Sequence, residues 1–92
     1  MAQTLFLHID HQEIPFHVGE SMMDMHGVLN QAKPHDWWFQ VKDEPSRFVL
    51  ASTPENMSQD TIHKLIYHGV LLSGGSPQNK NKVRFNKVCM FK

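Results

Sequence analysis

The apolar residues of this 92-residue chain follow two spacings, and the order of the two spacings limits the folds that the chain can adopt. One spacing places an apolar residue at every second position, which is typical of a half-buried β-strand. The other places apolar residues three and four positions apart, which is typical of an amphipathic helix. The first spacing predicts five strands, at Thr4–Asp10, Glu13–Val18, Asp36–Val41, Arg47–Ser52 and within Gln78–Lys92.

Two helices are predicted between these strands. The first begins at Ser21, which can cap it together with Asp24, and ends before Pro34 because the residue before a proline avoids the α region. The second is capped by Ser58 or Thr53 and ends at the Gly-Gly-Ser-Pro run of residues 74–77. Each helix has one apolar stripe, formed by Met22, Met25, Leu29 and Ala32 in the first and by Ile62, Leu65, Ile66 and Val70 in the second.

The resulting order, ββαββαβ, predicts a single α+β domain over residues 1–92. We expect two layers, a mainly antiparallel sheet of four or five strands with both helices on one face. Without its first strand, the order is that of the ferredoxin-like folds, in which the strand before the first helix lies inside the sheet. A local hairpin between Thr4–Asp10 and Glu13–Val18 would compete for a place beside that strand, so the strand order stays open.

The charges of the chain are unevenly distributed, although its formal net charge is zero. Residues 1–60 hold nine acidic and three basic residues, a balance of −6, whereas residues 61–92 hold six basic and no acidic residues, a balance of +6. Such asymmetry is typical of proteins with a polyanionic partner. In the alternative interpretation, strands from the two parts lie side by side and neutralise each other.

The basic residues concentrate in the last predicted strand. Alternation places Lys80, Lys82 and Arg84 on one face, with Val83 and Phe85 on the other. A row of cations with intervening asparagines suits phosphate oxygens, although lysines also protect edge strands from pairing with other sheets. The predicted binding residues are Lys80, Lys82, Arg84 and Lys87, with Lys64 and Lys92 as secondary candidates.

Aromatic residues offer a second type of contact. Phe6 and Trp38 are candidates for stacking on bases if they are exposed on the sheet. Trp37 and Trp38 are adjacent on one predicted strand, so their side chains must point to opposite faces. The alternative function is therefore a protein–protein module without nucleic-acid contact, anchored by the Trp37–Trp38 hairpin or by the acidic N-terminal part.

Enzymes, metal proteins and cofactor-binding proteins are not indicated by the sequence. Its seven histidines lack the close spacing of a metal site, and no nucleophile motif or glycine-rich phosphate loop is present. The single cysteine, Cys89, is expected to be a small buried side chain of the last strand, and it indicates a reduced, cytoplasmic compartment. No apolar run is long enough to span a membrane, and no leader sequence is apparent.

The chain resembles the small phage-encoded inhibitors of bacterial defence complexes, anti-CRISPR proteins among them. The resemblance lies in its length, its αβ layout and the charge concentrated around Lys80, Lys82, Arg84 and Lys87. It implies a non-enzymatic inhibitor that docks on a nucleoprotein partner such as a CRISPR surveillance complex. From the charge pattern, we expect the basic strand to contact that RNA- or DNA-containing assembly.

Overall fold

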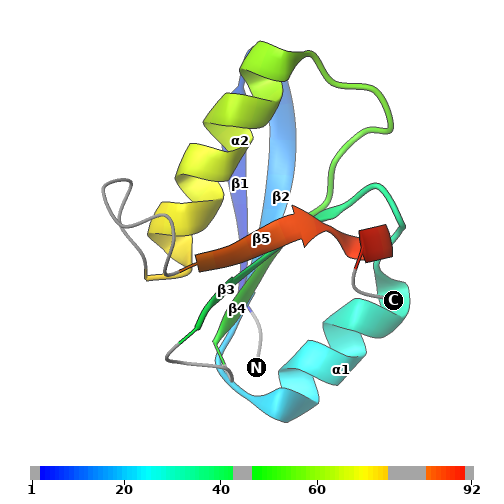
Figure 1. Ribbon diagram of the computed structural model, residues 1–92, viewed down its shortest axis with the longest axis vertical. Coiled ribbons are helices and arrows are strands. Elements are labelled where there is room, and N and C mark those ends of the chain that lie inside the picture. The colour runs from blue at the N-terminus through cyan, green and yellow to red at the C-terminus, as the bar shows by residue number, and fades with distance from the viewer. Residues whose placement is uncertain (1–2, 43–46, 75–82, 91–92) are drawn as a thin grey trace.

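The computed structural model describes residues 3–42, 47–74 and 83–90, and it confirms the predicted order of strands and helices. Figure 1 shows the elements along the chain. They are β1 (Gln3–Ile9), β2 (Gln12–Gly19), α1 (Met22–Gln31), β3 (Trp37–Val41), β4 (Phe48–Ala51), α2 (Gln59–Leu72) and β5 (Val83–Lys87), followed by a short 3-10 turn at Val88–Met90. Neither described helix is long and apolar enough to cross a membrane.

The five strands form one sheet in the order β1-β2-β4-β3-β5, and each neighbouring pair is antiparallel. The α+β class and the antiparallel five-stranded sheet are therefore as predicted. β1 takes the edge position beside β2, as the hairpin requires, and β5 lies at the opposite edge, beside β3. This order differs from the ferredoxin-like arrangement, in which the last strand would occupy the place that β1 fills here.

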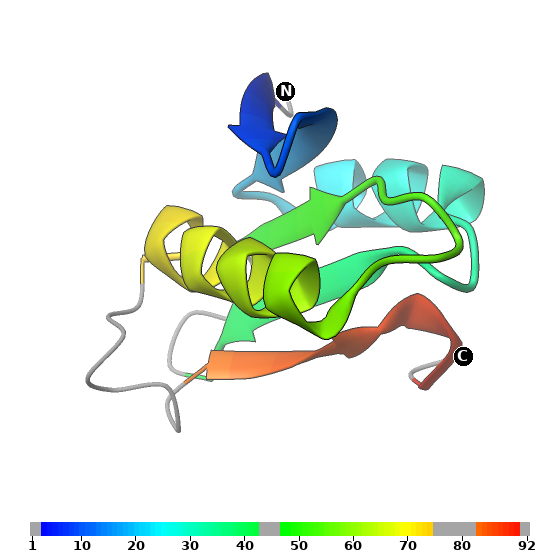
Figure 2. The same ribbon diagram turned by 90° about the horizontal axis from the view of Figure 1, so that it is seen from above.

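The two helices pack on opposite faces of the sheet, so the expectation of two layers with both helices on one face was wrong. Leu65 and Val70 of α2 pack with Phe39 and Val49 on one face. On the other face, Leu29 and neighbouring residues of α1 pack against a second cluster, formed by Trp38, Phe48, Leu50 and Val88. In Figure 1 the sheet runs between α2, at upper left, and α1, at lower right, and Figure 2 shows the same arrangement from above.

The position of β5 explains why the helices separate. Both helices connect parallel strands, because β2 and β3, and likewise β4 and β5, are each separated by one antiparallel neighbour. Both crossovers move in the same direction across the sheet, from β2 to β3 and from β4 to β5. Since β2 and β4 run in opposite directions, the right-handed rule for such crossovers places the two helices on opposite faces.

A tight turn joins β1 to β2. Ile9 pairs with Gln12, so Asp10 and His11 alone lie between the strands, and β2 begins one residue before the predicted Glu13. Asp10 and His11 have φ angles of 50° and 68°. Two successive left-handed residues match the twist of a hairpin, and aspartate adopts this conformation more readily than most side chains.

Both predicted serine caps are present. Ser21 Oγ accepts a hydrogen bond of 3.1 Å from the Asp24 amide, and Ser58 Oγ accepts one of 3.2 Å from the Thr61 amide. Such bonds satisfy N–H groups that a helix start leaves without a backbone partner. Thr53, the alternative cap for α2, instead lies buried beyond the end of β4.

The positions of two further side chains decide their predicted roles. Trp38, a candidate for base stacking only if exposed, is buried and stacked on Phe48, with ring centroids 5.0 Å apart. Cys89, expected to be buried in a strand, is exposed in the turn that follows β5. Both positions arise from tertiary structure, because α1 covers Trp38 and the last strand ends at Lys87.

Two glycines in helices should respond oppositely to replacement by alanine. At Gly69 of α2, a Cβ atom would lie 2.3 Å from the buried ring of Phe39, whereas at Gly27 of α1 it would meet nothing within 4 Å. We expect Gly69→Ala to lower the free energy of unfolding by about 1–3 kcal/mol through overpacking. Gly27→Ala should raise it by about 1 kcal/mol. Urea unfolding of both variants measures these changes, and a stabilised Gly69→Ala variant would contradict the described packing.

Candidate functional site

The described basic side chains of β5 are exposed but point to opposite faces of the sheet. Arg84 lies opposite Gln40 in the β3 register and faces the α1 side, whereas Lys87 lies opposite Trp37 and faces the α2 side. The two residues therefore flank the strand instead of forming one row. The predicted contact residues Lys80, Lys82 and Lys92 lie outside the described residues.

The described strand beside β5 carries no acidic side chain. The strand that pairs with β5 is β3, and its sequence, Trp37–Val41, contains no acidic residue. The first hairpin, which carries Asp10 and Glu13, lies at the other side of the sheet from β5. Among the described strands, β5 therefore does not pair with an acidic one.

Lys64, predicted as a secondary contact, lies on α2 and already has a partner within the domain. Its ammonium forms an ion pair with the Asp10 carboxylate at the β1–β2 turn, and Thr61 Oγ1 donates a second hydrogen bond of 2.8 Å to Asp10. The hydrogen bond from Lys64, together with that from Thr61, holds the pKa of Asp10 below its ordinary value of 3.8. The same hydrogen bond raises the pKa of Lys64, so this cation is engaged within the domain.

A hollow of about 290 Å³ lies beside Lys87 on the α2 face. Half-buried Trp37 and His35 line it together with the segment that leads into α2, including Asn56 and Gln59. Glu55 is the one acidic residue among the side chains that line it. The hollow therefore combines an aromatic ring, an ammonium group and two amides, which are the groups that contact bases and phosphates.

The carboxylate of Asp36 holds the walls of this hollow together. Asp36 is buried, and its two oxygens accept hydrogen bonds from the backbone amides of Lys33, at 2.9 Å, and Thr53, at 3.1 Å. Its carbonyl accepts a third bond of 2.8 Å from the Val88 amide. The Thr53 hydroxyl donates to the carbonyl of His35 at 2.9 Å. Asp36 thereby joins the chain before β3 to the segments after β4 and β5.

The two candidate aromatic contacts are not brought to the basic edge. Phe6 is 59% exposed, but it lies on β1, at the opposite edge of the sheet from β5. Trp38 belongs to the core beneath α1. Trp37, in contrast, lies opposite Lys87 in the β3–β5 register and lines the same hollow. Alternation alone could not show which of the two adjacent tryptophans takes this position.

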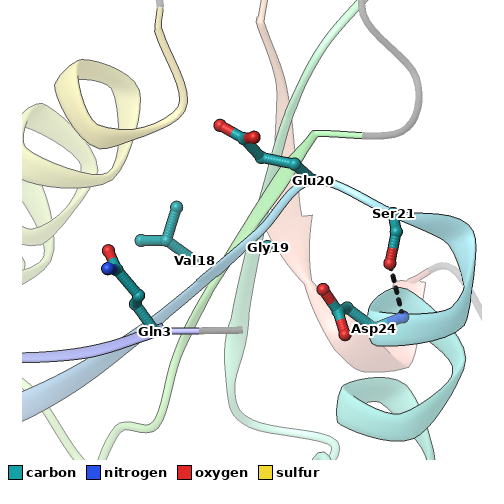
Figure 3. A pocket seen from close by; sticks show the side chains of 6 residues that line it. All are labelled: Gln3, Val18, Gly19, Glu20, Ser21 and Asp24. Carbon is teal, nitrogen blue, oxygen red and sulfur yellow. Dashed lines mark hydrogen bonds between the residues drawn. The ribbon is translucent and has the colours of Figure 1, made fainter. Parts of the chain in front are cut away.

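An open hollow of about 350 Å³ lies where β2 leads into α1 and is lined by Gln3, Val18, Gly19, Glu20, Ser21 and Asp24 (Figure 3). Its ionisable residues, Glu20 and Asp24, are both acidic, and Figure 3 shows the Glu20 carboxylate extended away from that of Asp24. Two carboxylates repel a phosphate, so this hollow does not suit phosphate binding. Among the described residues, no group of three His, Cys, Asp or Glu side chains is placed to hold a metal ion.

His17 makes a connection across three strands that the sequence pattern did not predict. Its Nδ1 lies 2.9 Å from Thr4 Oγ1 of β1, and its Nε2 lies 3.0 Å from Ser52 Oγ, just beyond β4. A small hollow of about 120 Å³ next to this group is lined by Val28, Gln31 and Leu50 as well. The partners are distant in sequence, so no local spacing could have revealed them. The group ties the first hairpin to the rest of the sheet.

The chain was compared with protein-family models, curated proteins and solved structures, and none of them matched. The β5 edge has three distinguishing properties: its charges, its neighbouring strand and the adjoining hollow. Of these, the exposed cations, the uncharged neighbouring strand and Trp37 are the features that a partner would meet.

Replacement of Asp36 should destabilise the domain strongly. Asp36→Ala would leave the amides of Lys33 and Thr53 without their acceptors, and that of Thr53 is part of a buried residue. We expect a loss of about 2–4 kcal/mol in the free energy of unfolding, because hydrogen bonds to a charged group are strong and their loss leaves buried donors unpaired. Asp36→Asn, which keeps one acceptor oxygen, should lose less. Equal losses in urea unfolding would contradict this account.

The ion pair of Asp10 should be visible in the pH dependence of stability. Because the folded-state pKa of Asp10 is lowered, its contribution is present above the ordinary pKa of 3.8 and is lost as the pH falls through the lowered folded-state value. We expect carbon NMR titration of the Asp10 carboxyl to give a pKa below 3.8, and Lys64→Ala to raise it. A Lys33→Ala variant is the control, and an unchanged Asp10 titration in Lys64→Ala would contradict the ion pair.

Proposed function

We propose that this chain is a non-enzymatic binding protein that docks on a nucleic-acid-containing assembly through its β5 edge. The observation that carries the proposal is the position of the basic strand. β5 lies at an edge of the sheet, and the strand that pairs with it has no carboxylate. The phosphates of a partner would attract the exposed cations of β5, and release of counterions from the nucleic-acid backbone would favour the complex.

The side chains that flank β5 have complementary roles in this proposal. Lys87 on one face and Arg84 on the other contact phosphates along the strand edge, and Lys80, Lys82 and Lys92 add positive charge in the adjoining sequence. Arg84 also makes an interaction within the domain, but a guanidinium has several N–H donors and can accept more than one partner. Trp37, in the hollow beside Lys87, offers a ring on which an unpaired base stacks.

The biological role that fits this surface is inhibition in the manner of the anti-CRISPR-type proteins. A small domain that covers a nucleic-acid path on a nucleoprotein complex, such as a CRISPR surveillance complex, needs an exposed charged edge and no catalytic group. The proposed setting is the reduced cytoplasm, in agreement with the single, exposed cysteine, Cys89. The support for this role is the charge and exposure of β5.

The alternative, a protein–protein module anchored by the Trp37–Trp38 hairpin, has less support. Trp38 is stacked on Phe48 in the domain's own core, so it is not available to a partner. Trp37 is half-buried, and the hollow that exposes it also contains Lys87. Trp37 is therefore better placed to assist a contact made by the basic strand than to anchor a separate one.

Matched pairs of substitutions test the proposal. The Arg84→Gln/Lys87→Gln and Lys33→Gln/Lys64→Gln variants each lose two positive charges, but only the first pair is on β5. We expect the first variant to bind a labelled single-stranded RNA of mixed sequence more weakly, with a salt slope of log affinity smaller by about 1–2. The second variant should keep the slope of the natural chain. Fluorescence anisotropy over a series of salt concentrations measures both quantities.

Two results would contradict the proposal. One is equal weakening of RNA binding in both variants, which would assign the effect to net charge instead of β5. The other is a shallow salt dependence of the natural chain, which excludes a mechanism based on phosphate contacts. Urea unfolding of each variant serves as the control for folding, since all four substituted side chains are solvent-exposed.

A further inference from the structure

The second edge of the sheet, β1, lacks the features that usually prevent an edge strand from pairing with another strand. Natural edge strands are protected by charged side chains, by proline or by bulges. β1 reads Gln3–Ile9 with no acidic residue, no lysine, no arginine and no proline, and its pairing with β2 is continuous over all seven residues. Its outer side therefore presents a regular row of backbone groups.

The backbone groups that point outward from β1 are those of Thr4, Phe6 and His8. In a hairpin with a two-residue turn, the residues flanking the turn form a hydrogen-bonded pair, and such pairs recur at every second residue. Ile9, Leu7 and Leu5 therefore direct their N–H and C=O groups to β2. The hydrogen bond of 2.9 Å from the Ser52 amide to the Pro15 carbonyl supports this parity, because Pro15, the partner of Phe6, faces β4 and Phe6 must face outward.

Apolar side chains are exposed on both faces of this edge. Phe6 is 59% exposed and shares its face with Thr4 and His8. Leu5 is 38% exposed on the other face, next to Leu7, which packs against the core beneath α2. Outward backbone groups between two exposed apolar side chains are the arrangement by which a sheet accepts an added strand.

We propose that β1 pairs in antiparallel fashion with β1 of a second copy of this chain, around a two-fold axis at Phe6. The two Phe6 residues then lie opposite each other, and Thr4 lies opposite His8 of the second copy. All three are outward-facing residues, so the pairing forms about six backbone hydrogen bonds. The sheets of the two copies become one continuous sheet, with β1 no longer at an edge.

A second copy is the partner that the pattern of this strand fits. The sequence Thr-Leu-Phe-Leu-His is symmetric about Phe6 in polarity, so the two-fold axis places Leu5 beside Leu7 and polar beside polar. Antiparallel pairing of two copies brings like charges together wherever a strand carries them, but here it brings none. The titratable residue of the strand is His8, which lies 3.5 Å from Glu13 of its own chain and faces a threonine across the interface. The formal net charge of zero removes long-range repulsion between the copies.

This dimer is independent of the proposed function and compatible with it. β1 and β5 lie at opposite edges of the sheet, so pairing through β1 leaves both β5 edges of the dimer open. A dimer would then carry one basic edge at each end. A chain that does not bind RNA would leave the dimer proposal standing. A chain that stays monomeric would likewise leave the proposed role of β5 standing.

Sedimentation equilibrium over a concentration series tests the pairing. We expect the mass of the full chain to rise from 10.7 kDa toward twice that value as concentration increases. Phe6→Lys and Phe6→Glu should each remain monomeric at all concentrations, because the axis brings two like charges together. An equimolar mixture of the two variants should associate again, since Lys then faces Glu. Met23→Lys, at an 87% exposed methionine of α1, is the matched control and should dimerise like the natural chain.

Amide hydrogen exchange gives a second measurement that does not depend on any variant. In the dimer, the amides of Thr4, Phe6 and His8 should gain protection as concentration increases, while those of Leu5 and Leu7 should be protected at every concentration. A mass of 10.7 kDa up to the highest soluble concentration would overturn the proposal. So would a Phe6→Lys variant that still dimerises, or exchange at Thr4, Phe6 and His8 that does not change with concentration.

Discussion

The buried carboxylate of Asp36 is the interaction on which the arrangement at the basic end of the sheet depends. It accepts bonds from segments that follow α1 and β4, while its carbonyl accepts the amide of Val88 at the end of β5. A buried charge is tolerated only where hydrogen bonds replace its hydration. Three separate segments must therefore meet at Asp36, and their meeting sets the end of β5 and the position of Lys87 against Trp37.

The edge position of β5 determines more than its own exposure. Because β1 occupies the place beside β2, β5 pairs with β3, and the direction of the second crossover is thereby fixed. The handedness of that crossover then separates the helices onto opposite faces. As a result, the sheet is covered on both faces at β3 and β4, and Trp38 becomes a core residue. The backbone groups that remain open to other molecules are those of the two edge strands, β1 and β5.

Local patterns predicted the parts of this fold that depend on local physics. The strand alternation and the caps at Ser21 and Ser58 are confirmed, since periodicity and capping act within a few residues. The prediction that both helices lie on one face was wrong because the face of each helix depends on strand order. That order is set jointly by the β1–β2 hairpin and by β5, which are far apart in the sequence. Likewise, alternation could not reveal that Lys64 pairs with Asp10, 54 residues away, or that the last strand ends before Cys89. Of the predicted β5 contacts that the structure describes, Arg84 and Lys87 are exposed on opposite faces, a difference in direction that follows from their odd spacing along the strand.

The two edge strands, β1 and β5, differ in whether charge hinders the pairing of another strand. An edge strand exposes unpaired backbone groups, and charge is the usual means of preventing unwanted pairing. β5 carries Arg84 and Lys87, so another strand meets repulsion there while a polyanion meets attraction. β1 carries no fixed charge and exposes Leu5 and Phe6, so a strand meets no such barrier. In the two proposals, the uncharged edge pairs with another strand and the basic edge meets a polyanionic partner, so the different charges of the two edges give them different roles.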